Sequence, residues 1–167
     1  GSWFDKRFAG QRFLKLDEAL DILEGDVRLN IHAKAHELDR AELATRVVRR
    51  LIERKVLERA FFASDQQTLA LARRVNQHLT ICNLSVTPVD NYILRSRAIG
   101  AVILQPGHAV TTPKLVAAAH AQGMQVNPFY ADEEAEMQRL IDCGVDGILT
   151  NYPEKLQTLL RGRKGAE

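Results

Sequence analysis

Three polar side chains recur at every second position in a short segment near the start of the sequence: Asn30, His32 and Lys34. Successive side chains of a β-strand point to opposite faces, so this spacing predicts that the three share one face. Ile31 and Ala33 would lie on the other face. A lysine that faces the interior of a protein must be paired or solvated. Lys34 therefore predicts either an ion pair or an anion site.

The spacing of the histidines allows two interpretations, a zinc site or a hydrogen-bonded interior histidine. His32 and His36 are four residues apart, and on a helix this spacing would suit zinc. The local sequence favours a strand, so a hydrogen-bonded interior histidine is the simpler interpretation of His32. We assign no role to His78 or His108, and we expect His120 to lie on a helix surface.

Cys82 and Cys143 lie in apolar surroundings and form no C-x-x-C pattern, so we expect buried thiols rather than a disulfide or a metal site. Asp146 is expected to cap a turn. No apolar run approaches the ~18 residues of a membrane span, and no signal peptide is visible. These features predict a reducing compartment and a cytoplasmic location.

The composition limits the classes of protein to which this sequence can belong. The sequence has 167 residues, of which 46% are hydrophobic and 26% charged. This profile is typical of a single globular domain with its own core. The net charge of +2 implies no strong attraction to nucleic acid or to a membrane surface. The basic residues between positions 46 and 59 alternate with apolar residues at helical spacing, which favours a solvated helix face.

Strands and helices are expected to alternate along the whole chain. About six parallel strands are expected from the apolar patterns, at residues 29–34, 60–64, 79–86, 101–105, 125–130 and 147–151. Helices are expected at residues 16–23, 37–57, 65–75, 113–123, 133–143 and 153–160, with a further, less regular helix after Pro88. Asp65 and Thr112-Pro113 are expected to begin two of these helices.

This alternation predicts an α/β protein with right-handed crossovers and a parallel sheet. Two architectures fit the pattern: an open doubly wound sheet, or part of an eight-stranded (β/α) barrel of the TIM type with its helices outside. No G-x-G-x-x-G opens a helix, so the dinucleotide-binding fold lacks its signature.

Three stretches of sequence carry a family signature. They are residues 1–20, residues 29–34 with the sequence LNIHAK, and residues 112–153, which end in GVDGILTNYP. Together they resemble the glycerophosphodiester phosphodiesterase family, whose third strand usually reads N-I-E-I-K. Residues 60–96 match that family weakly. The resemblance implies a partial barrel and the hydrolysis of glycerophosphodiesters to glycerol 3-phosphate and an alcohol, with a divalent cation such as Mg²⁺ or Ca²⁺.

The same resemblance points to parts of the family's catalytic apparatus that have no match here. That family begins with a strand ending in His-Arg-Gly, followed by a Glu-x-Asp pair and a second catalytic histidine. Residues 1–167 are therefore expected to form one N-terminally incomplete domain, with no catalytic acid or base and with weak or no activity.

The resemblance also implies roles for individual residues. Lys34 corresponds to the family's phosphate-contacting lysine, and His32 stands where a metal-binding carboxylate is usual. Phe129, Asp132 and Asn151 would lie at the mouth of the barrel. Hard cations prefer oxygen ligands, so we expect His32 to be a weak metal ligand at best.

The expected partners follow from these assignments. The ligand would be a glycerophosphodiester or another small phosphate, and no nucleic acid is expected. A barrel with unpaired edges invites association, so we expect a homo-oligomer or a partner segment that completes the ring. The alternative function is a non-catalytic binding or oligomerisation module that reuses the scaffold.

Overall fold

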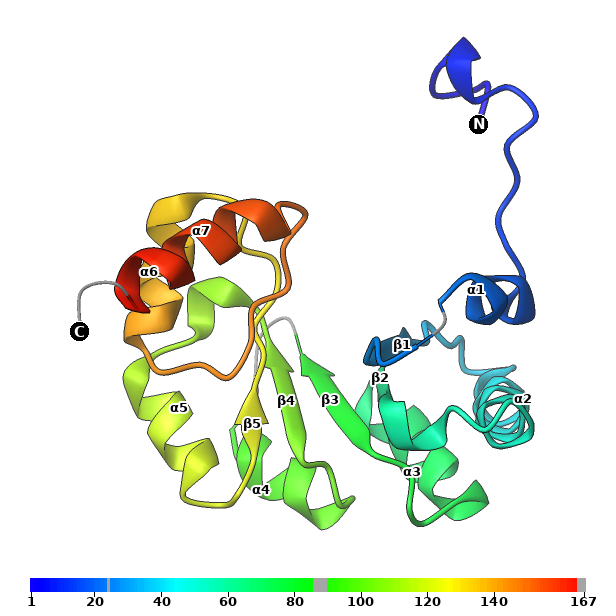
Figure 1. Ribbon diagram of the computed structural model, residues 1–167. Helices are drawn as coiled ribbons and strands as arrows, with labels where there is room; N and C mark the ends of the chain where they lie inside the picture. The colour runs from blue at the N-terminus through cyan, green and yellow to red at the C-terminus, as the bar shows by residue number, and fades with distance from the viewer. Residues whose placement is uncertain (24, 86–89, 165–167) are drawn as a thin grey trace.

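The computed structural model describes residues 1–23, 25–85 and 90–164. Its centre is one sheet of parallel strands in the order β1-β2-β3-β4-β5, so each strand pairs with its neighbours in sequence. The strands are β1 (Leu29–His32), β2 (Ala60–Ser64), β3 (Ile81–Ser85), β4 (Ile103–Pro106) and β5 (Gln125–Val126). Figure 1 shows the sheet crossing the molecule with helices on its outer side.

The helices alternate with the strands as far as α6, as the sequence predicts. The α-helices are α1 (Leu16–Ile22), α2 (Arg40–Glu53), α3 (Gln66–Val75), α4 (Tyr92–Ala98), α5 (Pro113–His120), α6 (Glu134–Asp142) and α7 (Pro153–Lys164). The described residues also form three short 3-10 helices: η1 (Lys6–Phe8) before α1, η2 (Leu57–Arg59) before β2, and η3 (His108–Val110) after β4. The α/β class and the parallel sheet are confirmed, and the arrangement fits part of a TIM-type barrel.

The prediction of about six strands is wrong by one among the described residues, which contain five. Residues 147–151 form no regular strand. Leu149 N donates to Pro128 O over 2.9 Å, and Ala131 N donates to Leu149 O over 3.1 Å. Pro128 has no N–H with which to continue a ladder, so the pairing along residues 125–130 is interrupted.

The expected long helix at residues 37–57 is also shorter, because α2 spans Arg40–Glu53. The predicted end of the third strand at Val86 and the residue Pro88 lie outside the described residues.

Two helix starts follow from single side chains, as predicted. Asp65 accepts hydrogen bonds from the backbone N–H groups of Gln67 and Thr68 at the start of α3. Thr112 accepts from Leu115 N at the start of α5, and Pro113 occupies the first turn. Each cap satisfies backbone donors that have no partner inside the helix.

The two faces of the strands have different surroundings. One face packs on the helical layer, where Leu29 and Phe62 join Val48 and Leu51 of α2 in the largest hydrophobic cluster. Ile31 and Ala33 pack against that cluster, which confirms that they lie on the outer face. The inner face carries a small buried cluster of its own, made of Phe61, Ala63, Cys82 and Ile103. This inner cluster forms a floor below the carboxyl ends of the strands.

The two cysteines differ from one another. Cys82 is buried and free, as predicted, whereas Cys143 is only partly buried because α6 ends at the surface beside it. Every helix among the described residues is too short or too polar to cross a lipid bilayer.

The N-terminal segment extends away from the sheet, and Figure 1 shows η1 well separated from the strands. Its aromatic residues pack on one another, with 5.8 Å between the ring centroids of Trp3 and Phe4. The side chains are otherwise open to solvent, since Trp3 is 86% and Phe13 98% exposed.

Candidate functional site

A cavity of about 340 Å³ opens at the carboxyl ends of the strands. Its walls come from successive strand ends and from the segments after β5: His32, Ala33, Lys34, Ala35, Ser64, Asp65, Leu84, Gln105, Phe129, Tyr130 and Leu149. Side chains from the ends of several parallel strands converge here, which is where barrels of this kind carry their ligand sites. The cavity lies directly above the floor formed by the inner cluster.

His32 and Lys34 both line this cavity, as their two-residue spacing predicts. Both residues are exposed, so the ammonium of Lys34 is solvated. The pKa of His32 is lowered, first by partial desolvation of the imidazole and second by the positive charge of Lys34. An imidazole with a lowered pKa stays neutral over most of the physiological range, which leaves Lys34 as the cation of this wall.

Ser64 and Asp65 are held in place by local hydrogen bonds. Ser64 Oγ donates to Ala33 O over 2.7 Å, which joins the end of β2 to the segment after β1. Asp65 accepts from Thr68 Oγ1 over 2.7 Å in addition to its two backbone donors. Burial raises the pKa of Asp65, but the hydrogen bonds from Thr68 and the charge of Arg40 outweigh it, and the pKa is lowered overall. Asp65 is therefore an ionised structural cap.

The three residues assigned to the mouth of the barrel separate in the structure. Phe129 lines the cavity. Asp132 and Asn151 instead bind one another, with 2.8 Å between Asn151 Nδ2 and Asp132 Oδ2. Asp132 also accepts from Asn151 N and from Thr150 Oγ1, and the hydrogen bonds from Asn151 lower its pKa most. This pair fixes the loop before α7.

Several cavity residues were not anticipated as site residues. Gln105, Ser64, Leu84, Tyr130 and Leu149 all belong to the wall. The available signal was positional, because Gln105 is the polar residue that ends the apolar run of residues 101–105. Only the fold shows that these positions meet at one edge of the sheet.

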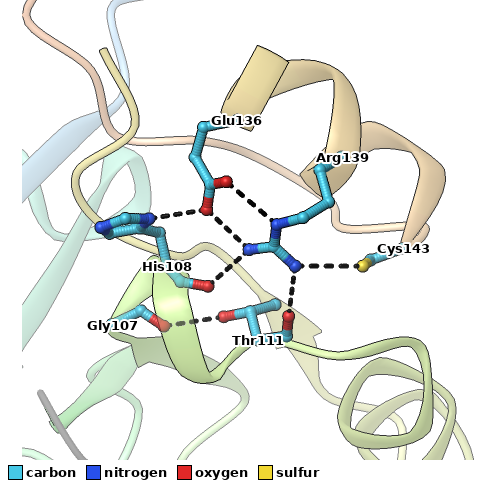
Figure 2. Close-up of polar contacts among 6 residues, drawn as sticks. All are labelled: Gly107, His108, Thr111, Glu136, Arg139 and Cys143. Carbon is cyan, nitrogen blue, oxygen red and sulfur yellow. Dashed lines mark hydrogen bonds and ion pairs between the residues drawn. The ribbon is translucent and has the colours of Figure 1, made fainter. Parts of the chain in front are cut away.

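A polar cluster braces the wall of the cavity from behind, and Figure 2 shows its six residues. Arg139 Nη2 donates to His108 O over 2.7 Å, and Nη1 donates to Thr111 O over 2.8 Å. His108 Nδ1 lies 2.6 Å from Glu136 Oε1. Hydrogen bonds from Arg139 and then from His108 lower the pKa of Glu136 to about 2.

This cluster connects α6 with the loop after β4, and that loop in turn holds Phe129. His108 N donates to Phe129 O over 2.9 Å, and Gly107 forms an isolated parallel bridge with Phe129. The cluster therefore positions one aromatic wall of the cavity. The sequence predicts no role for His108, since Glu136, the partner of its side chain, lies 28 residues away.

His120 and Asp146 have structural roles. Asp146 Oδ2 accepts from Val126 N over 2.7 Å and lies 2.9 Å from His120 Nε2. His120 lies on the surface of α5, as predicted. The prediction that Asp146 caps a turn is wrong, because its carboxylate instead joins the segment before residues 147–151 to β5 and to His120.

A larger hollow, of about 680 Å³, lies between α1 and α2 on the outside of the molecule. Its walls include Lys15, Leu43, Val47 and Arg50. It lies on the outside of the helical layer, and several of its charged residues already pair, as Arg50 does with Asp17 over 3.1 Å. We therefore take the smaller cavity as the candidate site.

The donor groups of this cavity do not fit a site for Mg²⁺ or Ca²⁺. Such cations prefer several oxygen ligands, but His32 offers nitrogen and both oxygens of Asp65 already accept hydrogen bonds. Within residues 1–23, 25–85 and 90–164, no three His, Cys, Asp or Glu side chains gather as a metal site. The role of His32 as a ligand stays a prediction.

The parallel sheet, the outer helices and the cavity at the strand ends define an α/β protein with the architecture of part of a TIM-type barrel. The model of the glycerophosphoryl diester phosphodiesterase family matches residues 1–155. The chain therefore belongs to that family.

Individual relatives agree with this assignment. The glycerophosphodiester phosphodiesterase of Caldanaerobacter subterraneus subsp. tengcongensis is 28% identical over 168 residues, covering 96% of this chain and 67% of that protein. A Bacillus subtilis protein of the same name is 22% identical over 186 residues, covering 97% of this chain and 61% of its own length.

Solved structures show the same fold. The crystal structure of a glycerophosphoryl diester phosphodiesterase from Silicibacter pomeroyi superposes with a TM-score of 0.84 at 27% identity, over 96% of this chain and 62% of that one. A phosphodiesterase from Oleispira antarctica, in complex with the product sn-glycerol-3-phosphate, gives a TM-score of 0.86 at 19% identity, over 96% and 66%. This chain thus spans 61% to 67% of the length of these four proteins.

Proposed function

We propose that this chain is a glycerophosphodiester phosphodiesterase-like domain whose cavity binds a glycerophosphodiester or a related small phosphate through Lys34. The observation that carries the proposal is the position of Lys34, an exposed cation in the wall of a cavity at the strand ends. Family membership adds the class of substrate. The solved relative that holds sn-glycerol-3-phosphate supports a small polyol phosphate as the ligand.

Electrostatics support Lys34 as the phosphate contact. The ammonium is a compact point charge with three donors, which suits a phosphate oxygen. His32 beside it adds a hydrogen-bonding group, and its pKa is lowered first by partial desolvation and second by the charge of Lys34. A bound phosphate would offset that repulsion and favour protonation of His32. The two residues therefore form one anion-binding wall in this proposal.

We propose further that this chain hydrolyses glycerophosphodiesters weakly or not at all. Phosphodiester hydrolysis in the family depends on carboxylate-bound divalent metal and on an acid and a base. Among the described residues of the cavity, the one carboxylate is Asp65, which caps α3. His32 is the one imidazole of that wall and cannot serve as acid, base and metal ligand together.

The test is a paired measurement on the full chain. Binding of inorganic phosphate and glycerol 3-phosphate is titrated by NMR, and glycerophosphocholine turnover is assayed with Mg²⁺ or Ca²⁺. The proposal expects binding that Lys34→Ala weakens about tenfold or more, since a hydrogen bond to a charged group contributes ~1.5–3 kcal/mol. Equal binding by Lys34→Ala would overturn the phosphate site. Rapid metal-dependent turnover would overturn the statement on weak activity.

A second candidate is a non-catalytic assembly module. It rests on β1, which lies at the edge of the sheet, and on the exposed aromatic residues of the N-terminal segment. An edge strand presents unpaired backbone groups to another chain. We propose that a second copy, or a partner segment, covers this edge. Sedimentation should then show concentration-dependent association, and a monomer at all concentrations with no bound partner would contradict it.

A further inference from the structure

Gln105 lies in the same cavity as Lys34, yet its environment is different. Gln105 lies near the end of β4 and is 0% exposed to solvent. Within the described residues, neither Nε2 nor Oε1 of its side chain has a hydrogen-bond partner. The side chain nevertheless lines the cavity wall. The wall of the cavity therefore contains both an exposed cation, Lys34, and a buried amide, Gln105.

The direction of the Gln105 side chain follows from strand alternation. Ile103, two residues earlier, belongs to the inner cluster with Phe61 and Cys82. Leu104 belongs to the outer cluster with Val116 and Val126. Gln105 thus points inward, one layer above the floor. Its side chain therefore lies on the cavity side of β4 and not on the side that the helices cover.

A buried amide without partners is costly. Leaving a buried donor or acceptor unsatisfied costs the free energy of removing that group from water, and an apolar side chain of similar size would avoid that cost. The neighbouring wall residue Leu84 shows that an apolar side chain is accommodated here. An amide at this position is explained when a ligand supplies both an acceptor for Nε2 and a donor for Oε1.

We infer that the side-chain amide of Gln105 hydrogen-bonds to a hydroxyl group of the ligand, whose phosphate binds to Lys34. A hydroxyl is both donor and acceptor, so one group can satisfy both atoms of the amide in turn or two neighbouring hydroxyls can satisfy both together. A cavity of about 340 Å³ lies near the small end of the range for ligand pockets, which suits a short polyol phosphate. This inference rests on the proposed function and adds a specificity-determining residue to it.

The experiment compares two ligands that differ only in their hydroxyl groups, glycerol 3-phosphate and n-propyl phosphate, titrated by NMR into the full chain. Wild type should prefer glycerol 3-phosphate by about five- to tenfold, the value of one or two matched neutral hydrogen bonds. Gln105→Met preserves length and volume without polar atoms, so it should abolish the preference and leave the affinity for n-propyl phosphate unchanged. Leu84→Met, a matched change in the same wall, should keep the preference.

The outcomes separate this inference from the proposed function. If Gln105→Met keeps the preference, or if wild type has none, Gln105 does not read the hydroxyl, while a Lys34-dependent phosphate site still stands. If neither ligand nor inorganic phosphate binds wild type, the proposed function fails, and the inference fails with it.

The Tm of thermal unfolding provides a second test of the role of Gln105. Without ligand, Gln105→Met should match or exceed the Tm of wild type, because no partner is lost. A lower Tm for this variant than for Leu84→Met would mean that the amide bonds within the protein, which overturns the inference.

Discussion

The imidazole of His108 and the carboxylate of Glu136 meet across the gap between the β4 loop and α6, with 2.6 Å between Nδ1 and Oε1. The guanidinium of Arg139 lies on the other side of the same carboxylate, with 2.7 Å between Nη2 and Oε1. Because Arg139 also donates to two loop carbonyls, this cluster fixes the loop that bonds to Phe129. The cavity wall thus depends on a cluster that does not itself line the cavity.

Removing the guanidinium should therefore destabilise the fold. Arg139→Met is expected to lower the free energy of unfolding by about 2–4 kcal/mol, since two carbonyls and a carboxylate lose charged donors. Urea unfolding followed by circular dichroism measures this change. Arg163→Met is the matched control, because the one partner of Arg163 among the described residues is Asp142, at an exposed position. That control should cost less than about 1 kcal/mol. Equal losses would contradict the bracing role of Arg139.

The same cluster should make stability depend on pH in the acid range. The pKa of Glu136 is about 2 in the folded chain, against ~4.3 for an unperturbed glutamate. A lowered folded pKa stabilises the fold fully above the unfolded value and progressively less as the pH falls toward 2. Asp65 and Asp132 have lowered pKa values and act in the same direction.

Urea unfolding at pH 6, 4 and 3 tests this dependence. Glu136→Gln should be less stable than wild type at pH 6, and the difference should shrink as the pH falls. The exposed Glu134→Gln on the same helix is the control and should follow the wild-type profile. A Glu136→Gln profile parallel to that of wild type would argue against the lowered pKa.

His32 provides a direct test of the anion-binding wall. Its pKa should lie below the ordinary ~6.5, because of partial desolvation and then of Lys34. In Lys34→Ala the pKa should rise, and saturating phosphate should raise it in wild type. An NMR titration of the ring protons reports all three values. A pKa above 6.5 in the free wild type would contradict the arrangement of the two side chains.

The cap of α3 connects the cavity wall to the fold. Asp65→Ala removes the acceptor of two backbone N–H groups and of Thr68 Oγ1. The expected cost is about 1–2 kcal/mol in unfolding free energy. Asp26→Ala, at an exposed position, should cost less than ~0.5 kcal/mol. A cost for Asp65→Ala that does not exceed the control would show that the cap contributes little.

Local features of the fold could be read from the sequence because they depend on nearby residues. The cap residues Asp65 and Thr112 act within three positions, and the alternation at residues 29–34 follows from the geometry of a single strand. The apolar pattern of residues 147–151 predicts a strand that the structure does not form, because the irregular pairing of this segment depends on Pro128, a distant partner that lacks a donor.

The site was predictable only in part. The two-residue spacing of His32 and Lys34 predicts that they share one face, and both line the cavity. Gln105 and the His108–Glu136 contact depend on which strand ends converge and on which helix covers which loop. Such contacts join residues far apart in the chain, so no local pattern of residue types marks them.

The central claim is that Lys34 makes this cavity a phosphate site. The most direct measurement is an NMR titration of glycerol 3-phosphate into wild type and into Lys34→Ala. Saturable shifts at cavity residues in wild type, with affinity reduced about tenfold or more in the variant, are the expected result. Identical affinities, or shifts confined to residues outside the cavity, would contradict the claim.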